Sequence, residues 1–235
     1  MLQDIKKMLQ KKASPVKAKL LAGFFKTGKG QYGEGDVFLG VMVPETRKVA
    51  LHFKHASLKD LHALLSSAFH EERLCALFIL VHQFQHADAS HQKKLVDFYL
   101  KHAGKVNNWD LVDLSAPKLL GAYLLSKPRK KLFSLAQSKN LWKRRIAVLS
   151  CFAFIKENDF KDAFAIAEFL LQDPHDLIHK AVGWMLREIG KKDQPAEEHF
   201  LKKHAKHMPR TMLRYAIEKF PEPKRRQYLN QKGRL

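Results

Sequence analysis

The sequence predicts an all-α protein, and three observations lead to that prediction. Apolar residues recur at intervals of three and four positions, as in residues 61–84 and 176–192, which is the spacing of one face of a helix. Almost no segment alternates apolar and polar residues at the period of two that a half-buried strand needs. Prolines and glycines separate the apolar runs, so we expect helices of about ten to fifteen residues joined by short turns.

The expected helices repeat along the chain. Comparable helix starts recur every 34 to 36 residues and fall at Arg73, Trp109, Arg145, Lys180 and Arg214. This period matches two short helices plus turns, stacked as in HEAT-like repeats. We therefore expect residues 1–235 to form a single HEAT-like repeat domain, an α-α superhelix (solenoid) with a concave basic groove.

The chain is strongly basic. Its 43 Lys and Arg outnumber 23 Asp and Glu, which gives a net charge of +20 and a pI of about 9.9. Self-repulsion among so many cations opposes folding, and the usual compensation is a polyanionic partner, with nucleic acid ahead of an anionic membrane surface. A chain that is basic without any functional reason stays an alternative.

The repeated helix starts would place four cations and Trp109 in one row, which suits a phosphate backbone. On this basis we expect Arg73, Lys180 and Arg214 to contact DNA. The other interpretation is that helix starts are solvated and that basic residues there are incidental.

Several functional classes are disfavoured by what the sequence lacks. It has no run of about 18 apolar residues that would span a bilayer and no signal-peptide core at its N-terminus. Cys75 and Cys151 lie within apolar helical runs, so we expect both to be reduced thiols in the core. We therefore expect a cytoplasmic protein of the bacterial cytosol that does not bind membranes and associates with the nucleoid through DNA.

A metal site is also disfavoured. His82 and His86 are four residues apart, as metal ligands on a helix can be. No Glu follows His82 as in HExxH, and no cysteine pair completes a zinc site. We expect neither a metal nor an organic cofactor.

Two regions stand apart from the predicted repeats. Residues 28–35, GKGQYGEG, lack the GK[ST] ending of a phosphate-binding loop, so a mobile loop or turn is favoured over a nucleotide site. The segment 202–235 holds eleven Lys or Arg and two Glu, and it is expected to comprise the last repeat and a short basic tail at 221–235. That tail is a candidate electrostatic contact for DNA.

The segment 106–121 carries the most specific pattern. Trp109 and Asp113 are four residues apart, so on a helix they share a face. Asp110 follows the turn at Asn107–Asn108 and suits a helix start. Asp113 comes too late to cap, and two explanations stay open: a salt bridge to Arg145 of the next repeat, or a functional carboxylate.

Four segments carry a family resemblance. They are FLGVMVPETRKVA (38–50), NNWDLVDLSAPKLLG (107–121), NLWKRRIAVLS (140–150) and HKAVGWMLREIG (179–190). In this order and spacing the chain resembles the AlkD-like DNA alkylation repair proteins, which are HEAT-like repeat DNA glycosylases, over nearly its whole length. The WDxxD helix is the specific signal, whereas FLGVxVP and the basic helix starts also occur in non-catalytic relatives.

The resemblance implies roles for individual residues. Asp113 matches the catalytic carboxylate, Trp109 and Trp184 match side chains that line the deoxyribose of the damaged nucleotide, and Arg145 matches an arginine that grips the backbone nearby. Met42 departs from the pattern, because relatives often carry a polar Gln or Arg there that could contact DNA. Phe25 lies near an aromatic contact of the family, and the Gly-rich insertion follows it.

Neighbouring cations extend the candidate DNA surface. Arg144 adjoins Arg145, and Lys180 and Arg187 flank Trp184 at helical spacing. Lys180 is a phosphate candidate, whereas Arg187 suits either DNA or a bridge to Glu188. Trp142 is expected in the core.

These features together predict a monofunctional glycosylase that hydrolyses cationic N3- and N7-alkylpurines from duplex DNA and works as a monomer. Such purines are good leaving groups, so the enzyme needs mainly a fixed carboxylate and indole faces to stabilise the oxocarbenium-like sugar. No lysine replaces Asp113 to form a Schiff base. The alternatives are a non-catalytic HEAT-repeat protein that binds bent or branched DNA, and a HEAT-type adaptor for acidic proteins.

Overall fold

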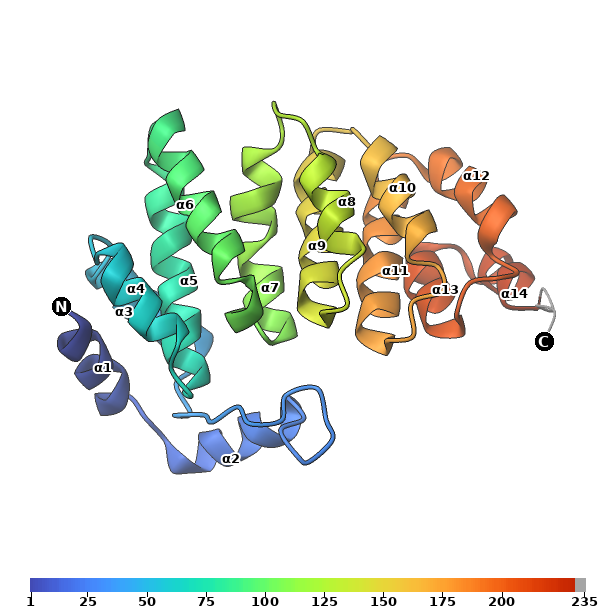
Figure 1. Ribbon diagram of the computed structural model, residues 1–235. Coiled ribbons are helices and arrows are strands. Elements are labelled where there is room, and N and C mark those ends of the chain that lie inside the picture. Colours follow the sequence, from blue (N-terminus) through green and yellow to red (C-terminus); the bar gives the residue numbers. More distant parts are fainter. Residues whose placement is uncertain (231–235) are drawn as a thin grey trace. The chain divides into compact units, whose positions relative to one another are not determined.

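The computed structural model describes residues 1–230, and every regular element in that range is a helix (Figure 1). The described residues form fourteen α-helices, and their one isolated β-bridge joins Val37 to Phe69. The all-α prediction is therefore confirmed for residues 1–230. The chain divides into two compact units at Ser115–Ala116, and each is described by itself. The single domain and its concave basic groove stay predictions.

The first unit is organised around one long buried helix. Helix α5 contacts α1, α3, α4, α6 and α7, and 13 of its 16 residues are buried. The helices of this unit are α1 (Leu2–Lys11), α2 (Pro15–Phe24), α3 (Val43–His52), α4 (Leu58–Leu65), α5 (His70–Gln85), α6 (Ala89–Lys101), the 3-10 helix η1 (Ala103–Lys105) and α7 (Trp109–Ser115).

Side-chain caps explain where several of these helices begin. Ser57 and Asp60 form a reciprocal capping box at the start of α4, in which each side chain accepts from the other's backbone N–H. The Asp88 carboxylate accepts from the backbone N–H of His91 at 2.8 Å and opens α6. Such contacts satisfy backbone donors that a helix start would otherwise leave unpaired.

The second unit stacks helices in pairs. Helix α11 contacts α9 and α13. Helix α8 packs on α9, α10 packs on both α9 and α11, and α12 packs on α11. Figure 1 shows α8 beside α9 and α10 beside α11. The helices are η2 (Pro117–Gly121, a π-helix), α8 (Lys130–Ala136), α9 (Leu141–Lys156), α10 (Lys161–Phe169), α11 (Asp176–Gly190), α12 (Gln194–His204), α13 (Arg210–Ala216), the 3-10 helix η3 (Ile217–Lys219) and α14 (Glu222–Asn230).

A recurring contact sets the register of the repeat. The guanidinium groups of Arg73 and Arg144 each donate to the carbonyls six and five residues earlier, at 2.9 to 3.1 Å, and the His179 ring donates to the carbonyl six residues earlier at 2.5 Å. Positions 73, 144 and 179 are therefore equivalent. Arg145 and Lys180, which the sequence analysis aligned with Arg73, come one residue later. One residue turns a side chain by about 100° around a helix, so these two residues face another way.

Two segments differ in detail from the expectations. Most of the predicted basic tail is helix α14, whose Tyr228 ring packs 5.9 Å from that of Phe220 and is buried. Residues 231–235 of that tail lie outside the described residues. The Gly-rich segment 28–35 consists of turns closed by its own side chains, since Gln31 and Glu34 accept backbone N–H groups of that segment.

Neither a membrane span nor a metal cluster is found in the described part of the chain. No helix within residues 1–230 is both long and apolar enough to cross a bilayer. No group of three or more His, Cys, Asp or Glu in the same range is arranged to hold a metal ion. His86 instead donates through Nδ1 to the carbonyl of His82 at 2.8 Å.

Candidate functional site

Helix α7 carries the Trp109–Asp113 pair. It begins at Trp109, whose backbone N–H donates to the Asn108 side-chain oxygen at 2.8 Å. Trp109 and Asp113 are both half-buried, one helical turn apart. The sequence expectation that the two side chains share one face of a helix is consistent with this placement.

Aromatic rings from the end of α2 pack against Trp109. The Phe25 ring stacks on the indole at a centroid distance of 5.1 Å, and Phe24 meets it edge-on at 5.8 Å. Phe25 is buried, whereas Phe24 is 63% exposed. One face of the Trp109 indole is therefore packed against Phe25. The exposed Phe24 ring beside it continues the aromatic surface toward solvent.

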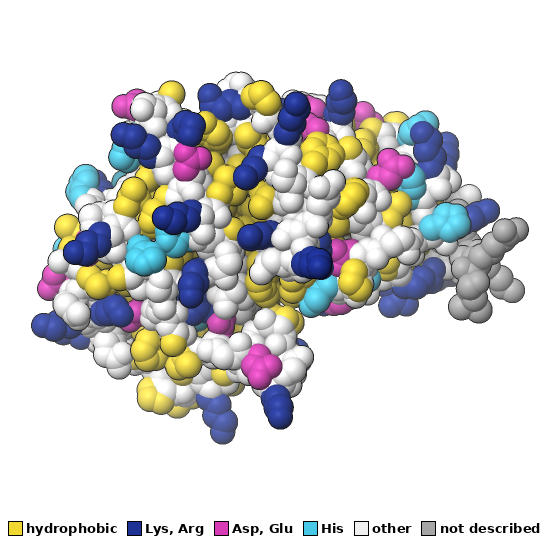
Figure 2. Space-filling view, viewed as in Figure 1, with side chains coloured by type: hydrophobic (Ala, Val, Ile, Leu, Met, Phe, Trp, Pro, Cys, Tyr) yellow, Lys and Arg dark blue, Asp and Glu magenta, His cyan; other side chains and the backbone are white. Residues whose placement is uncertain are grey.

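The rest of α2 is also exposed. Val16, Leu20 and Phe24 follow at intervals of four residues and form an apolar row on the surface. Figure 2 shows hydrophobic side chains exposed over this helix. No residue of α2 is fully buried.

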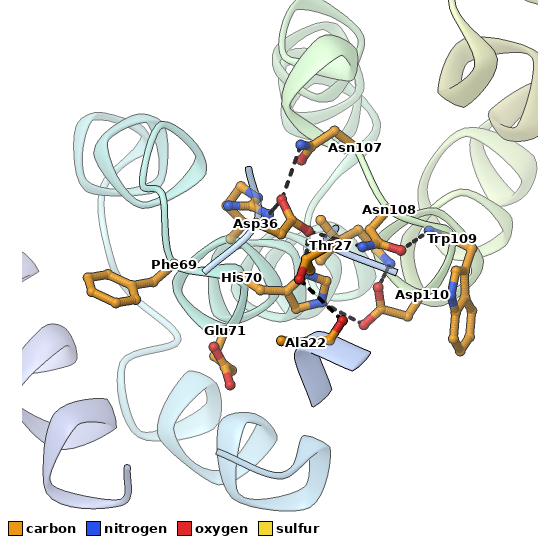
Figure 3. A network of polar contacts seen from close by, with 12 residues as sticks. Ala22, Thr27, Asp36, Phe69, His70, Glu71, Asn107, Asn108, Trp109 and Asp110 are labelled. Atoms are coloured by element: carbon orange, nitrogen blue, oxygen red, sulfur yellow. Dashed lines mark hydrogen bonds and ion pairs between the residues drawn. The ribbon is translucent and has the colours of Figure 1, made fainter. Parts of the chain in front are cut away.

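A buried polar cluster lies directly behind Trp109. His70, the first residue of α5, stands between two carboxylates: its Nδ1 is 3.1 Å from Asp36 Oδ2 and its Nε2 is 2.8 Å from Asp110 Oδ2. The Asn108 side-chain amide donates to Asp36 at 3.0 Å. Figure 3 shows these side chains converging, with the Trp109 indole turned away from them.

Contacts within the cluster shift the pKa values of Asp36 and His70. Burial alone would raise the pKa of Asp36, but the hydrogen bond from His70, the charge of Arg73 and the Asn108 amide outweigh it and keep that pKa below its usual value. Burial alone would lower the pKa of His70, yet its hydrogen bonds to Asp110 and Asp36 raise it. The shifts of both residues favour their charged forms, an anionic Asp36 and a cationic His70.

Four consecutive polar residues at the start of α5, His70 to Arg73, are all buried and tie this region together. The Glu71 carboxylate accepts backbone N–H groups of residues 39, 40 and 41 at 2.8 to 3.1 Å. Arg73 Nη2 donates to Asp36 Oδ1 at 2.5 Å. The FLGV segment is thereby anchored to α5.

Gly40 in that segment cannot be replaced without disturbance. Its φ of +82° lies in the left-handed region, and an added Cβ would meet the Ser14 carbonyl at 2.1 Å. The next residues lead to Met42, which is 45% exposed at the start of α3.

Asp113 influences the core on its own side of α7. The Tyr99 hydroxyl is 3.0 Å from the Ser115 hydroxyl and fully buried. Burial raises the pKa of Tyr99, the Ser115 hydrogen bond lowers it, and the negative charge of Asp113 raises it further. The half-buried Asp113 carboxylate thus stands near a phenol that stays protonated.

In the second unit, Arg145 and Trp184 lie on α9 and α11. Arg145 is only 4% exposed, and its Nη1 donates to the Leu177 carbonyl in the first turn of α11 at 2.5 Å. The Trp184 indole is half-buried and donates to Glu188 at 3.1 Å. Gly183 lets α13 approach closely, because a Cβ there would meet a carbonyl of that helix at 2.4 Å.

The remaining predicted DNA-binding residues fall into two groups. Arg73 and Arg144 are engaged inside their units, with Asp36 and Asp173 respectively. Arg187 contacts Glu188 and Glu218, so the bridge to Glu188 that the sequence suggested is present. Two cations are more accessible: Lys180, whose side chain is 39% exposed and pairs with Asp176, and Arg214, which is exposed on α13.

Lys and Arg side chains are scattered among other residue types over the face in Figure 2. None of the DNA assignments is tested by these contacts, so they stay predictions. Arg73 also has a structural role, because it is buried and pairs with Asp36. Trp142 is buried, as expected of a core residue.

Sequence reasoning missed the cluster around His70. The available signal was HEER at residues 70–73, four polar residues in succession inside the apolar run 61–84. A solvated stretch that long would interrupt a buried helix, so buried partners were to be expected. The partners themselves, Asp36 and Asp110, are distant in sequence and carry no local pattern.

Comparisons with known proteins agree with this fold. The family described as "DNA alkylation repair enzyme" matches residues 5–220. A solved structure described as a predicted DNA alkylation repair enzyme from Enterococcus faecalis shares the fold with a TM-score of 0.70 and 16% identity, over 90% of this chain and 98% of its own.

A second solved structure is the protein smu.31 from Streptococcus mutans UA159, with a TM-score of 0.56 and 22% identity over 77% of this chain and 93% of its own. No curated protein sequence matches the chain. Because the family match spans nearly the whole chain, this protein belongs to the DNA alkylation repair enzyme family.

Proposed function

We propose that the protein is a monofunctional DNA glycosylase that releases cationic N3- and N7-alkylated purines from duplex DNA and leaves an abasic site. Membership of the DNA alkylation repair family implies a DNA substrate. The observation that carries the finer proposal is the half-buried Trp109–Asp113 pair on one face of α7. No cofactor is required by this chemistry.

The proposed chemistry asks little of acid catalysis. An alkylated purine already bears a positive charge, so its glycosidic bond breaks without a protonated side chain at the base. The sugar becomes cationic as the bond breaks, and a fixed carboxylate at Asp113 with the Trp109 and Trp184 indoles would stabilise it. Asp113 would also orient the attacking water. The base departs with the electrons of the glycosidic bond as a neutral purine, water supplies the hydroxyl of the abasic sugar, and the water's second proton is released to solvent.

Electrostatics supports a duplex as the substrate. The net charge of +20 favours binding to a phosphate backbone. Lys180 and Arg214 have accessible side chains and are the proposed phosphate contacts. Arg145 is proposed to act near the lesion. Arg145 is buried on α9, and its guanidinium lies against the start of α11. The proposed role therefore requires DNA to contact the guanidinium at that point.

The test compares wild-type protein with Asp113→Asn on DNA treated with a methylating agent. Released 7-methylguanine and 3-methyladenine are measured by chromatography under single-turnover conditions. We expect the variant to be slower by about 100-fold or more, the usual effect of removing a group that stabilises transition-state charge. Asp97→Asn is the matched control, because Asp97 is an exposed carboxylate on α6.

Other outcomes select other functions. No release by the wild type, or equal release by Asp113→Asn, contradicts the catalytic proposal. DNA binding without release would support a scaffold for bent or branched DNA. DNA affinity that does not fall steeply with salt would support an adaptor for acidic proteins, since phosphate contacts give a steep negative slope.

A further inference from the structure

We propose that His70 is a positioning residue for this reaction: held as an imidazolium between Asp36 and Asp110, it fixes Trp109 where the damaged nucleotide is met. The inference rests on the proposed function for its catalytic consequence. Its structural content, a protonated histidine that sets the place of Trp109, stands on the contacts of the first unit alone.

The hydrogen-bond geometry requires the doubly protonated ring. Each nitrogen of His70 lies within 3.1 Å of a different carboxylate oxygen, and a carboxylate accepts but does not donate. A neutral imidazole has one N–H, so one nitrogen lone pair would face a carboxylate oxygen. Only the imidazolium donates to both Asp36 and Asp110.

The charges around the ring support the same state. Arg73 pairs with the other oxygen of Asp36, and the rings of Phe25 and Phe38 pack at 5.0 and 4.6 Å from the imidazole. The groups facing His70 are therefore two acids, one guanidinium and two apolar rings. With His70 charged, the buried cluster is neutral, whereas a neutral ring would leave a net negative charge away from water.

Contacts on both sides of Trp109 transmit the state of His70. Asn108 accepts from the Trp109 N–H and donates to Asp36. Asp110 follows Trp109 and accepts from His70. Phe25 stacks on the indole and packs on the imidazole as well. The backbone before Trp109, the backbone after it and the ring behind it are thus all tied to His70 or its partner.

Loss of the proton should therefore loosen Trp109. The hydrogen bonds to Asp110 and Asp36 outweigh burial and raise the pKa of His70, so the ring loses its proton at a higher pH than a free imidazole does. One of the two contacts then becomes repulsive, and the first turn of α7 loses an anchor. Base release should decline on the alkaline side with the same midpoint.

The first experiment observes Trp109 without any assay of activity. The chain has three tryptophans, so protein labelled with 5-fluorotryptophan gives three fluorine resonances, and Trp109→Phe identifies the relevant one. We expect the Trp109 resonance of the wild type to shift between pH 6 and pH 10 with a midpoint above 6.5. A resonance that stays constant over this range while the protein remains folded would overturn the proposal.

The second experiment uses His70→Gln, whose amide cannot act as a cation between two carboxylates. We expect its Trp109 resonance to be displaced and to lose the titration, its base-release rate to fall about 10- to 100-fold at pH 7, and its DNA affinity to stay within about twofold. His91→Gln is the control, because His91 is exposed on α6. If His70→Gln fails to fold, the wild-type titration still decides.

The two proposals fail in different ways. Absence of base release by the wild type at every pH contradicts the glycosylase function but leaves the fluorine titration as evidence on His70. A wild type that releases bases with no alkaline decline, together with an unshifted Trp109 resonance, contradicts the role of His70 alone.

Discussion

Glu197 should make the protein less stable as pH rises. This carboxyl lies on α12, is 1% exposed, and has one oxygen, Oε1, with no hydrogen-bond partner among residues 1–230. Burial, and next the charge of Glu198, raise the pKa of Glu197 to about 9, while Arg187 opposes the shift. The folded protein therefore carries a neutral carboxylic acid at neutral pH.

The sign and size follow from comparing the folded and unfolded chains. From pH 4.5, the reference pKa of the carboxyl, up to about 9, the unfolded chain loses this proton and the folded chain keeps it, so stability falls as pH rises. The cost accumulates at about 1.4 kcal/mol per pH unit and reaches about 3 kcal/mol at pH 7. Above pH 9 the folded state also ionises and the cost levels off.

Glu197→Gln removes the titration and keeps the shape of the side chain. We expect the variant and the wild type to have similar unfolding free energies at pH 5, and the variant to be more stable by about 3 kcal/mol at pH 7. In urea this corresponds to a midpoint higher by roughly 1 M, for a slope of about 3 kcal/mol per M. Urea titrations followed by circular dichroism at pH 5, 6, 7 and 8 measure the difference.

The same change at an exposed site provides the control. Glu168→Gln alters a carboxylate on α10 whose side chain is 64% exposed, and its effect should not grow from pH 5 to pH 8. If the advantage of Glu197→Gln does not widen with pH, the carboxyl ionises in the folded state and the reasoning from burial is refuted.

Three further outcomes are expected. Arg73→Met strands the buried Asp36 carboxylate and should lower the unfolding free energy by about 3–5 kcal/mol, measured in urea; an unchanged midpoint would contradict this. Burial raises the pKa of Cys75 and Cys151 to about 12, so a thiol reagent at pH 8 should label neither until denaturant is added. Arg214→Ala should reduce the salt dependence of DNA binding by about one phosphate contact, whereas Arg144→Ala should mainly reduce stability.

The sequence predicted the class of fold because helical periodicity is local. The apolar spacing of residues 61–84 determines which face of a helix is buried, and that information does not depend on distant residues. The 35-residue period likewise survives in the equivalence of Arg144 and His179. The apolar spacing and the repeat period each depend on many residues. The surroundings of any single residue therefore change them little.

The roles of single cations could not be predicted in the same way. Arg73 and Arg214 have the same side chain and were aligned by the same period, yet Arg73, the fourth residue of α5, is buried and Arg214, the fifth residue of α13, is exposed. The buried partner of Arg73 is Asp36, which lies 37 residues before it and is brought to it by the tertiary structure. From the sequence alone, a basic residue in a repeat can therefore be either a DNA contact or half of a structural ion pair. Its partner in the fold decides between the two.

The buried charges behind Trp109 are better explained by geometry than by stability. Replacing a buried ion cluster with well-packed apolar side chains often leaves stability unchanged or raises it. The His70 cluster is therefore not the most stabilising way to pack α5 against α7. Apolar packing, however, would leave the direction of the Asn108 and Asp110 side chains unspecified. Hydrogen bonds to fixed carboxylate and imidazole atoms specify it, and these two residues flank Trp109 in the chain. A site that must present an indole in one orientation gains from such a cluster what a larger apolar core would not supply.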